Sequence, residues 1–275
     1  MNLQTKRKLN NGVEMPILGL GVYEAKEETV NAVKCALQTG YRHIDTAAFY
    51  GNEEDVGRGV RESGIARNEI FITTKVWNSD MRAGTQREAF EKSLKKLSLD
   101  YIDLYLVHWP VPDKYKETWK ILEQLYQEGL VRAIGVSNFE ISHLEDLLAD
   151  AKVVPAVNQI EIHPRNTRKE LISYCEGKGI VCEAWSPLGA GTLLKNELLL
   201  KIGEKHQKSS AQVMLRWDLQ QGILTIPKST NPNRIRENAD IFDFELTKEE
   251  MNTIDSLNQN QFNEVTGADP NHVDF

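Results

Sequence analysis

Short hydrophobic, β-branched runs recur along the chain, and a longer amphipathic segment separates each run from the next. The runs begin near Ile17, Tyr41, Ile70, Tyr101, Val131, Ala156, Ile180 and Ile223. Apolar residues repeat at helical spacing in the intervening segments 27–39, 85–97, 116–128, 142–151 and 168–177. Because strands that alternate with helices pair in parallel, eight such units predict a closed (β/α)8 TIM barrel.

Smaller elements are expected at both ends of this barrel. Asn11-Gly12 lies within residues 9–15 and is a strong hairpin signal, so a β-hairpin should cap the barrel floor. The last gap between strands carries two helical patterns, 196–206 and 209–220, and another follows at 247–258. Since no linker or repeat interrupts the chain, we expect a single domain spanning residues 1–275.

Ionisable side chains follow three successive predicted strands. Asp45 ends the second strand and Tyr50 follows five residues later, while Lys75 and His108 end the third and fourth strands. A charge at the end of a buried strand is costly unless it is paired. The carboxyl ends of parallel barrel strands meet at one mouth, so we expect these four side chains to converge there as an active site.

Composition and charge exclude several other classes of protein. The chain has 275 residues, of which 40% are hydrophobic and 27% charged, as in an ordinary globular enzyme. Its formal charge of −7 argues against nucleic acid or an anionic membrane as a partner. The three cysteines, Cys35, Cys175 and Cys182, form no CxxC pattern and fit a reducing compartment, and no segment suggests export. We expect a cytoplasmic monomer without a metal site or an obligate protein partner.

Four stretches of the sequence carry a resemblance to a known family. They are residues 40–47 (GYRHIDTA), 50–53 (YGNE), 134–139 (IGVSNF) and 226–229 (IPKS). In this order they resemble the signatures of the aldo-keto reductases from end to end, with the greatest likeness to bacterial reductases of glyoxal, methylglyoxal and diketogluconate. The resemblance implies an (α/β)8 barrel, an extended NADPH cofactor and the catalytic tetrad Asp45, Tyr50, Lys75 and His108.

The tetrad fits the chemistry of carbonyl reduction. Hydride comes from nicotinamide, and a general acid must give a proton to the forming alkoxide. Tyr50 is that acid in our interpretation. Because an ammonium about 4 Å away is worth roughly 4 kcal/mol, Lys75 should lower the pKa of the phenol by about two or three units. Asp45 would orient Lys75, and His108 would hydrogen-bond the substrate oxygen.

Later strand ends carry the candidate cofactor contacts. Amide and hydroxyl groups at Ser137, Asn138 and Gln159 suit a carboxamide, and the resemblance assigns them to the nicotinamide amide. Trp185 stands where the family stacks an aromatic ring, usually tyrosine, on the nicotinamide. By the same resemblance, the diphosphate and ribose contacts are Gly21, Val22, Tyr23, Ser186 and Leu188, and Asp45 also lies beside the cofactor.

A basic cluster follows the eighth predicted strand. Lys228, Ser229 and Arg234 surround the start of a helix, a combination that suits a phosphate monoester. The alternative to a phosphate site is a helix with an ordinary N-cap, whose basic residues are solvated and bind no ligand. The resemblance assigns these three residues to the adenosine 2′-phosphate, and Glu237 and Asn238 to the adenine.

The substrate pocket is less fully specified. Tyr23, Trp77 and Trp109 should line the mouth beside Tyr50 and His108, which favours a small carbonyl compound with some apolar character. In the family, a carboxyl-terminal loop walls this site. Residues 259–275 are few and polar here, so we expect an open pocket with broad specificity.

Two other functions stay open from the sequence, and one competing motif is dismissed. Lys75 could form a Schiff base in a lyase, and the chain could be a non-catalytic module that senses NADPH. Gly19 and Gly21 with Asp45 mimic a dinucleotide fingerprint, but Glu24 replaces its third glycine. A lone partial motif of this kind is weak evidence for a dinucleotide-binding fold.

Overall fold

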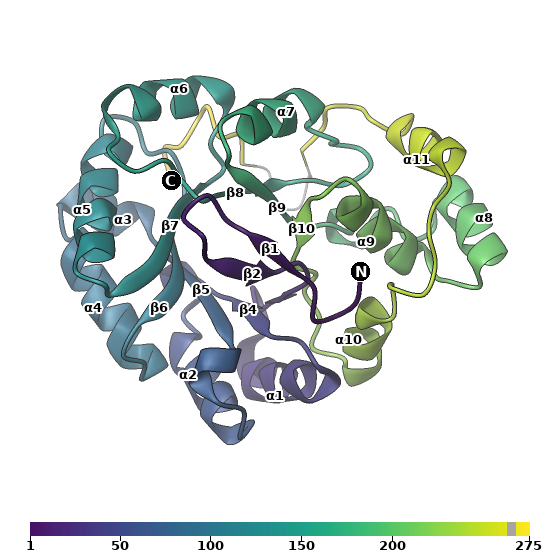
Figure 1. The fold of residues 1–275 in the computed structure, drawn as a ribbon, viewed down its shortest axis with the longest axis horizontal. Helices are drawn as coiled ribbons and strands as arrows, with labels where there is room; N and C mark the ends of the chain where they lie inside the picture. Colours follow the sequence, from purple (N-terminus) through teal and green to yellow (C-terminus); the bar gives the residue numbers. More distant parts are fainter. Residues whose placement is uncertain (263–267) are drawn as a thin grey trace.

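Parallel strands closed into a barrel form the centre of the structure, a computed structural model in which residues 1–262 and 268–275 are described (Figure 1). The strands are β3 (Leu20–Gly21), β4 (His43–Asp45), β5 (Phe71–Val76), β6 (Ile102–Val107), β7 (Val131–Ser137), β8 (Val157–Glu161), β9 (Val181–Trp185) and β10 (Leu224–Thr225). They pair in chain order, and the bridges Leu18–Thr225 and Gly21–Lys228 join the last strand to the first. The predicted (β/α)8 barrel is confirmed.

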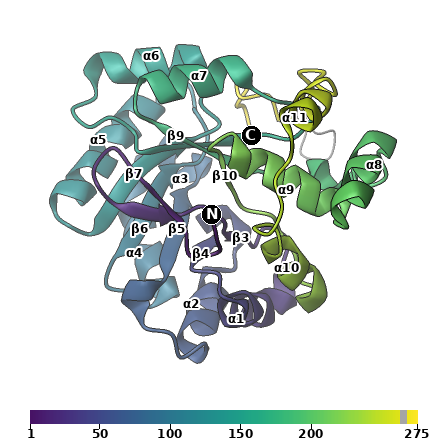
Figure 2. The ribbon, with the colours of Figure 1, turned by 45° about the vertical axis from the view of Figure 1, so that its right-hand side comes forward.

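Helices surround the strands on the outside (Figure 2). The α-helices are α1 (Thr29–Thr39), α2 (Glu53–Glu62), α3 (Asn78–Ala83), α4 (Gln86–Leu97), α5 (Tyr115–Gln127), α6 (Ile141–Asp150), α7 (Lys169–Gly177), α8 (Glu197–His206), α9 (Ser210–Gln220), α10 (Pro232–Ala239) and α11 (Lys248–Asp255). Short 3-10 turns are η1 (Lys26–Glu28), η2 (Ala48–Tyr50), η3 (Arg67–Glu69) and η4 (Gly189–Gly191). None of the described helices is both long and apolar enough to cross a membrane.

Helix boundaries follow local capping chemistry as well as hydrophobic period. The side chains of Ser209 and Thr247 each accept a hydrogen bond from a backbone amide in the first turn of the helix. The side chains of Gln212 and Glu250 in turn accept from the backbone amides of Ser209 and Thr247, which completes a capping box at each helix. The predicted helices lie within a few residues of the observed ones. Helix α3 was not predicted, because in six residues only Asn78 and Met81 are buried and no repeating apolar face is visible.

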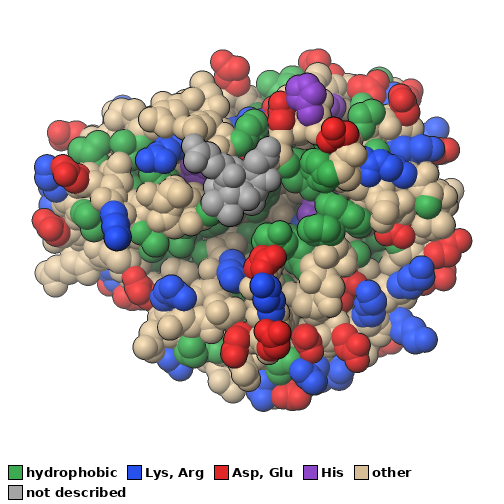
Figure 3. Space-filling model, turned by 180° about the vertical axis from the view of Figure 1, so that it is seen from behind, with side chains coloured by type: hydrophobic (Ala, Val, Ile, Leu, Met, Phe, Trp, Pro, Cys, Tyr) green, Lys and Arg blue, Asp and Glu red, His purple; other side chains and the backbone are tan. Residues whose placement is uncertain are grey.

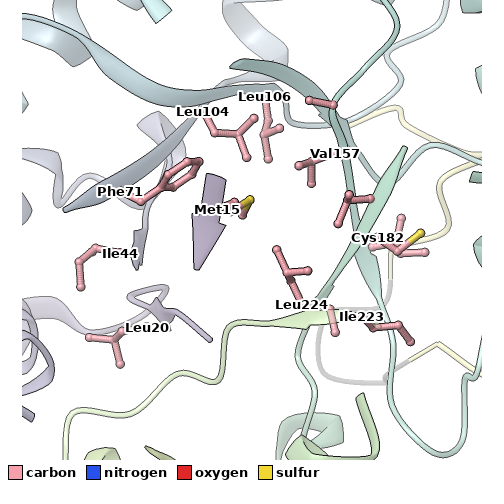
Figure 4. Close-up of a cluster of buried hydrophobic side chains, with 14 of the residues drawn as sticks. Met15, Leu20, Ile44, Phe71, Leu104, Leu106, Val157, Cys182, Ile223 and Leu224 are labelled. Carbon is pink, nitrogen blue, oxygen red and sulfur yellow. The ribbon is translucent and has the colours of Figure 1, made fainter. Parts of the chain in front are cut away.

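The amino-terminal hairpin closes the barrel floor, as predicted. Its strands β1 (Lys6–Lys8) and β2 (Glu14–Pro16) pair antiparallel. Its turn reaches the amino-terminal ends of two barrel strands, because Asn10 Nδ2 donates to the backbone oxygen of Pro155, just before β8, and Asn11 Nδ2 to that of Arg132, at the start of β7. Figure 4 shows Met15 drawn between side chains of the barrel strands, including Phe71 and Leu104. Met15 is fully buried and therefore fills the floor of the barrel.

Two glycines that mimic a dinucleotide motif serve the closure of the barrel instead. A Cβ atom at Gly19 would lie 2.4 Å from Nδ1 of His43, and one at Gly21 would lie 2.9 Å from the backbone oxygen of Ile226. Both separations are far below van der Waals contact. The first strand therefore needs glycine at these positions to lie against the second and the eighth.

We predict that Met15→Ala destabilises the protein by about 2–5 kcal/mol, because the truncated side chain leaves a cavity in the floor. Urea unfolding followed by tryptophan fluorescence measures the loss. Leu200→Ala is the matched control, since Leu200 lies on α8 and is 43% exposed. A loss for Met15→Ala no larger than that of the control would show that the floor does not depend on this side chain.

Candidate active site

A buried ion pair lies at the carboxyl ends of strands β4 and β5. Nζ of Lys75 donates to Oδ1 of Asp45 at 2.7 Å and to the backbone oxygen of Thr46 at 2.8 Å. Both charged side chains are almost wholly buried. Burial lowers the pKa of Lys75, but Asp45, Tyr50 and Glu183 together raise it above its ordinary value. The lysine is therefore held as an ammonium ion.

Tyr50 is the third partner of this ammonium ion. It ends the 3-10 turn η2, and its Oη lies 3.5 Å from Nζ of Lys75. Burial raises the pKa of Tyr50 above its ordinary value, while Lys75 acts in the opposite direction. The net shift is upward, so the expectation that Lys75 lowers this pKa overall was wrong. The desolvation of the phenol outweighs the attraction of the cation, and Tyr50 keeps its proton at neutral pH.

His108 follows β6 and lies edge-on to two aromatic rings. The centroid of its ring is 5.8 Å from that of Tyr50 and 5.0 Å from that of Trp77. Burial, and then the charge of Lys75, lowers the pKa of His108 well below its ordinary value. His108 is therefore a neutral imidazole. Its Nδ1 is buried without a hydrogen-bond partner among the described residues.

Aromatic side chains border the mouth above these groups. Tyr23 packs against Tyr50 at 4.9 Å between ring centroids, and Phe49 stacks on Trp77 at 3.9 Å. Trp109 completes the predicted set and is almost buried. Figure 3 shows the face of the barrel opposite the floor, where hydrophobic side chains border a hollow. Phe49 was missed by sequence reasoning, although an aromatic residue directly before Tyr50 was the available signal.

The carboxyl-terminal segment reaches this mouth. The ring of Phe275 lies 5.3 Å from that of Trp109 and 6.3 Å from that of Trp77. Arg82 donates to the backbone oxygens of Phe275 and Val273 at 2.6 and 3.1 Å, which fixes the segment to α3. Of the loop predicted over 259–275, residues 263–267 lie outside the described residues. Its described end lies against the mouth, where the resemblance to the family places this loop.

The candidate nicotinamide contacts form one hydrogen-bonded group. Oγ of Ser137 donates to the backbone oxygen of Gln159 and accepts from Nδ2 of Asn138. Nδ2 of Asn138 also donates to the backbone oxygen of His108, and its Oδ1 accepts from Nε1 of Trp185 at 2.8 Å. Asn138 therefore orients the indole of Trp185. The tyrosine that is usual at this position in the family has no indole N–H group to donate this bond.

The basic cluster lies at the start of helix α10. Lys228 and Arg234 are exposed, and neither forms a salt bridge within the described part of the chain. Ser229 is buried beside them. Asn231 caps the helix by accepting from the amides of Asn233 and Arg234. Two amides at the start of this helix are thus occupied by the cap, whereas the side chains of Lys228 and Arg234 are exposed.

The remaining predicted cofactor contacts are spread around the same rim. Gly21 bridges to Lys228, which places the end of the first strand beside the basic cluster. Glu237 accepts a hydrogen bond from Ser209 and is half-buried. Among the other predicted contacts, Val22 and Asn238 are buried, Leu188 is half-buried and Tyr23 is 42% exposed. Ser186 has a positive φ of 51°.

Two buried ionisable residues, Glu183 and His43, lie beneath the ion pair and were not predicted from the sequence. Nε2 of Gln159 donates to Oδ2 of Asp45 at 2.8 Å and to Oε2 of Glu183 at 2.7 Å. His43 lies on the other side of Glu183, with Nδ1 3.6 Å from Oε1. A charged residue inside an otherwise apolar predicted strand was the signal for Glu183.

Comparison with known proteins places this geometry in a family. Residues 18–259 match the Aldo/keto reductase family, and the chain belongs to it. It is 59% identical to glyoxal reductase of Bacillus subtilis over 100% of this chain and 99% of that protein. It is 46% identical to methylglyoxal reductase of Escherichia coli K12, over 96% of each chain. Membership in this family of reductases makes the protein an oxidoreductase.

Solved structures agree with this assignment. An aldo-keto reductase from a Medee basin deep-sea metagenome library superimposes with a TM-score of 0.94 at 47% identity, over 98% of this chain and 100% of that one. A Bombyx mori aldo-keto reductase in complex with NADP gives a TM-score of 0.88 at 40% identity, over 94% of each chain. The fold is therefore shared with known aldo-keto reductases.

We predict that Lys75→Met destabilises the protein by about 3–5 kcal/mol at neutral pH, because it leaves the carboxylate of Asp45 buried without its cation. The double variant Asp45→Asn with Lys75→Met should lose clearly less than the sum of the single losses. Urea unfolding provides the free energies for this cycle.

Lys34→Met is the control for that cycle, since Lys34 pairs with Glu62 on the surface. It should cost less than about 1 kcal/mol. Additive losses for the Asp45 and Lys75 variants would contradict the interpretation of the two residues as one buried unit.

Proposed function

We propose that the protein is an NADPH-dependent reductase that converts aldehydes and reactive dicarbonyls, such as glyoxal and methylglyoxal, to alcohols. The observation that carries this proposal is the ammonium ion of Lys75, which is shared between Asp45, the backbone of Thr46 and the phenol of Tyr50. These groups lie at the base of a mouth bordered by aromatic rings, which would suit a small carbonyl compound. The names of the relatives, a glyoxal reductase and a methylglyoxal reductase, support the substrate class.

The residues around the mouth fit an NADPH cofactor. Lys228 and Arg234 have no acidic partner among the described residues and would hold the 2′-phosphate, with Ser229 between them. Oε1 of Gln159 accepts no hydrogen bond from the described residues, and it would accept one from the carboxamide. Trp185 would stack on the nicotinamide, while Glu237 and Asn238 would contact the adenine. When bound, the nicotinamide supplies the hydride.

Tyr50 would donate the proton despite its raised pKa. A forming alkoxide is a stronger base than a phenolate, so the transfer becomes favourable as the hydride arrives. The phenolate left behind would lie 3.5 Å from Nζ of Lys75. At an effective dielectric constant of about 20 this contact is worth roughly 5 kcal/mol, which appears only as negative charge develops. Lys75 would therefore stabilise the product of the proton transfer rather than the resting phenol.

His108 would orient the substrate as a neutral imidazole. Its depressed pKa leaves one N–H group, which can donate to the carbonyl oxygen without adding a second buried cation beside Lys75. Dicarbonyls carry an electron-withdrawing neighbour and need less of this help than simple ketones. The geometry therefore favours activated small carbonyl compounds.

The observed geometry disfavours a Schiff-base lyase. A lysine attacks a carbonyl only as a neutral amine. Asp45 and its neighbours instead raise the pKa of Lys75, and the three donors of its ammonium group already have acceptors. No comparable observation favours a non-catalytic, cofactor-sensing role.

We predict that Tyr50→Phe lowers turnover of methylglyoxal by at least the roughly 10²–10⁴-fold expected for loss of a general acid. Affinity for NADPH, measured by quenching of tryptophan fluorescence, should stay within about twofold, because only one hydroxyl group is removed. Tyr105→Phe is the matched control, since Tyr105 is a fully buried tyrosine in β6. Retention of more than about a tenth of the wild-type turnover would move the role of acid to another residue.

A second variant tests the cofactor. Arg234→Ala should raise KM for NADPH by roughly 10- to 100-fold, as expected for one charge-assisted contact, and leave KM for NADH nearly unchanged. Arg236→Ala is the control, because Arg236 lies in the same helix and hydrogen-bonds to Asn233. Equal losses for both cofactors would place the phosphate site elsewhere.

A further inference from the structure

Gln159 connects two buried carboxyl groups that come from different strands. Its two amide hydrogens point at Oδ2 of Asp45 and at Oε2 of Glu183, at 2.8 and 2.7 Å. All three residues are at least 98% buried. An amide NH2 group has two donors and no more, so this arrangement fixes which end of the amide faces the carboxyl groups. The carbonyl oxygen of Gln159 is left to face away from both.

Glu183 and His43 have one unpartnered atom each, and these atoms face one another. Oε1 of Glu183 and Nδ1 of His43 are buried, lack a hydrogen-bond partner among the described residues and lie 3.6 Å apart. Nε2 of His43 lies 3.0 Å from Oγ1 of Thr73. If Nε2 carries the hydrogen, Nδ1 is an acceptor. A proton on Oε1 of Glu183 would then give both orphaned atoms a partner after a small movement.

The charges that face Glu183 also favour a neutral acid. Asp45 on β4 is a nearby negative charge, and Lys75 on β5 is a positive charge already shared with Asp45 and Tyr50. Gln159 on β8 and His43 on β4 are uncharged, and Leu224 pairs with Glu183 from β10. Burial, and then Asp45, raises the pKa of Glu183 to about 8.

We propose that Glu183 is a positioning residue that works as a neutral carboxylic acid: by accepting from Gln159 it fixes the amide so that Nε2 holds Asp45 and Oε1 is presented to the nicotinamide carboxamide. This inference rests on the proposed reductase function. It extends the site by one layer, from the groups at the mouth to the buried acid beneath them. Ionised Glu183 would add a negative charge near Lys75 and oppose formation of the phenolate on Tyr50.

The pH dependence of the reaction tests this role through two variants. Glu183→Gln keeps an acceptor for Gln159 and a donor for His43, so turnover at pH 7 should stay within about threefold of wild type. Wild type should show a fall in kcat/KM near pH 8, and this fall should be absent in Glu183→Gln. Glu183→Leu removes the acceptor and should weaken NADPH binding about tenfold, the effect of one lost hydrogen bond.

Asp218→Asn is the matched control for these variants. Asp218 is a second fully buried carboxyl group, bonded to Thr225 and outside the site, and burial raises its pKa well above the ordinary value. This variant should keep the alkaline fall in kcat/KM. An activity loss in Glu183→Gln as large as that in Glu183→Leu would overturn the proposal, because it would mean that the ionised form is required.

A measurement on the protein without cofactor or substrate separates this inference from the reductase function. Infrared difference spectra between pH 6 and pH 10 should show a protonated carboxyl band that is lost near pH 8 in wild type and is missing in Glu183→Gln. If the same band persists in Glu183→Gln, Glu183 is not the neutral acid, and the proposal is overturned even if the protein reduces carbonyls. Conversely, the band would identify the neutral acid in a protein that failed every reductase assay.

Stability provides a further check with a defined sign. The pKa of Glu183 is raised from 4.5 to about 8 in the folded protein, so its contribution is fully favourable below pH 4.5 and is lost as pH rises through 8. Between these values the native state holds a proton that the unfolded state releases. Wild type should therefore lose stability relative to Glu183→Gln as pH rises from about 5 to 8. A constant difference would contradict the raised pKa.

Discussion

The ion pair between Asp45 and Lys75 is the constraint on which the rest of the site depends. Two opposite charges buried at the centre of a protein cost several kcal/mol each in lost hydration, and only close contact and additional hydrogen bonds offset that cost. Here the contact is 2.7 Å, and Thr46, Tyr50 and Gln159 supply the additional bonds. Thr46 and Tyr50 lie in the segment that follows β4, whereas Gln159 lies in β8. Closure of the strands and filling of the floor by Met15 are therefore conditions for the chemistry at the opposite end.

The site combines a rigid charged base with an aromatic rim. At the base, the carboxylate of Asp45 and several neutral groups surround a single ammonium ion, and a neutral His108 avoids a second cation. At the rim, stacked rings such as Phe49 on Trp77 offer shape and apolar area rather than fixed hydrogen bonds. In the proposed function, the base would set the reaction, and the rim would set which carbonyl compounds reach it. Phe275 belongs to the rim although it is remote in sequence from the other rings.

The sequence predicted the barrel, its floor hairpin and the convergence of the tetrad, because hydrophobic period and strand-end chemistry are local signals. It did not predict α3, whose six residues are too few to show a period. The direction of the pKa shift at Tyr50 was wrong, since a pairwise estimate with Lys75 contains no measure of burial. The pairing of Gln159 with Glu183 was also beyond reach, because it depends on the register between strands β8 and β9. The contact of Phe275 with Trp109 depends on the path of a loop that composition does not define.

The charge of Lys75 acts on the phenol of Tyr50 and opposes the effect of burial on its pKa. The most direct measurement of this action is a titration of Tyr50 by nuclear magnetic resonance, with tyrosine labelled with carbon-13 at the ring carbon that bears the hydroxyl group. Tyr50→Phe identifies the signal. Tyr50 should stay protonated through neutral pH in wild type and should titrate at a distinctly higher pH in Lys75→Met, where the opposing cation is gone. A titration that is unchanged or moves to lower pH in Lys75→Met would contradict this action of Lys75 on the phenol.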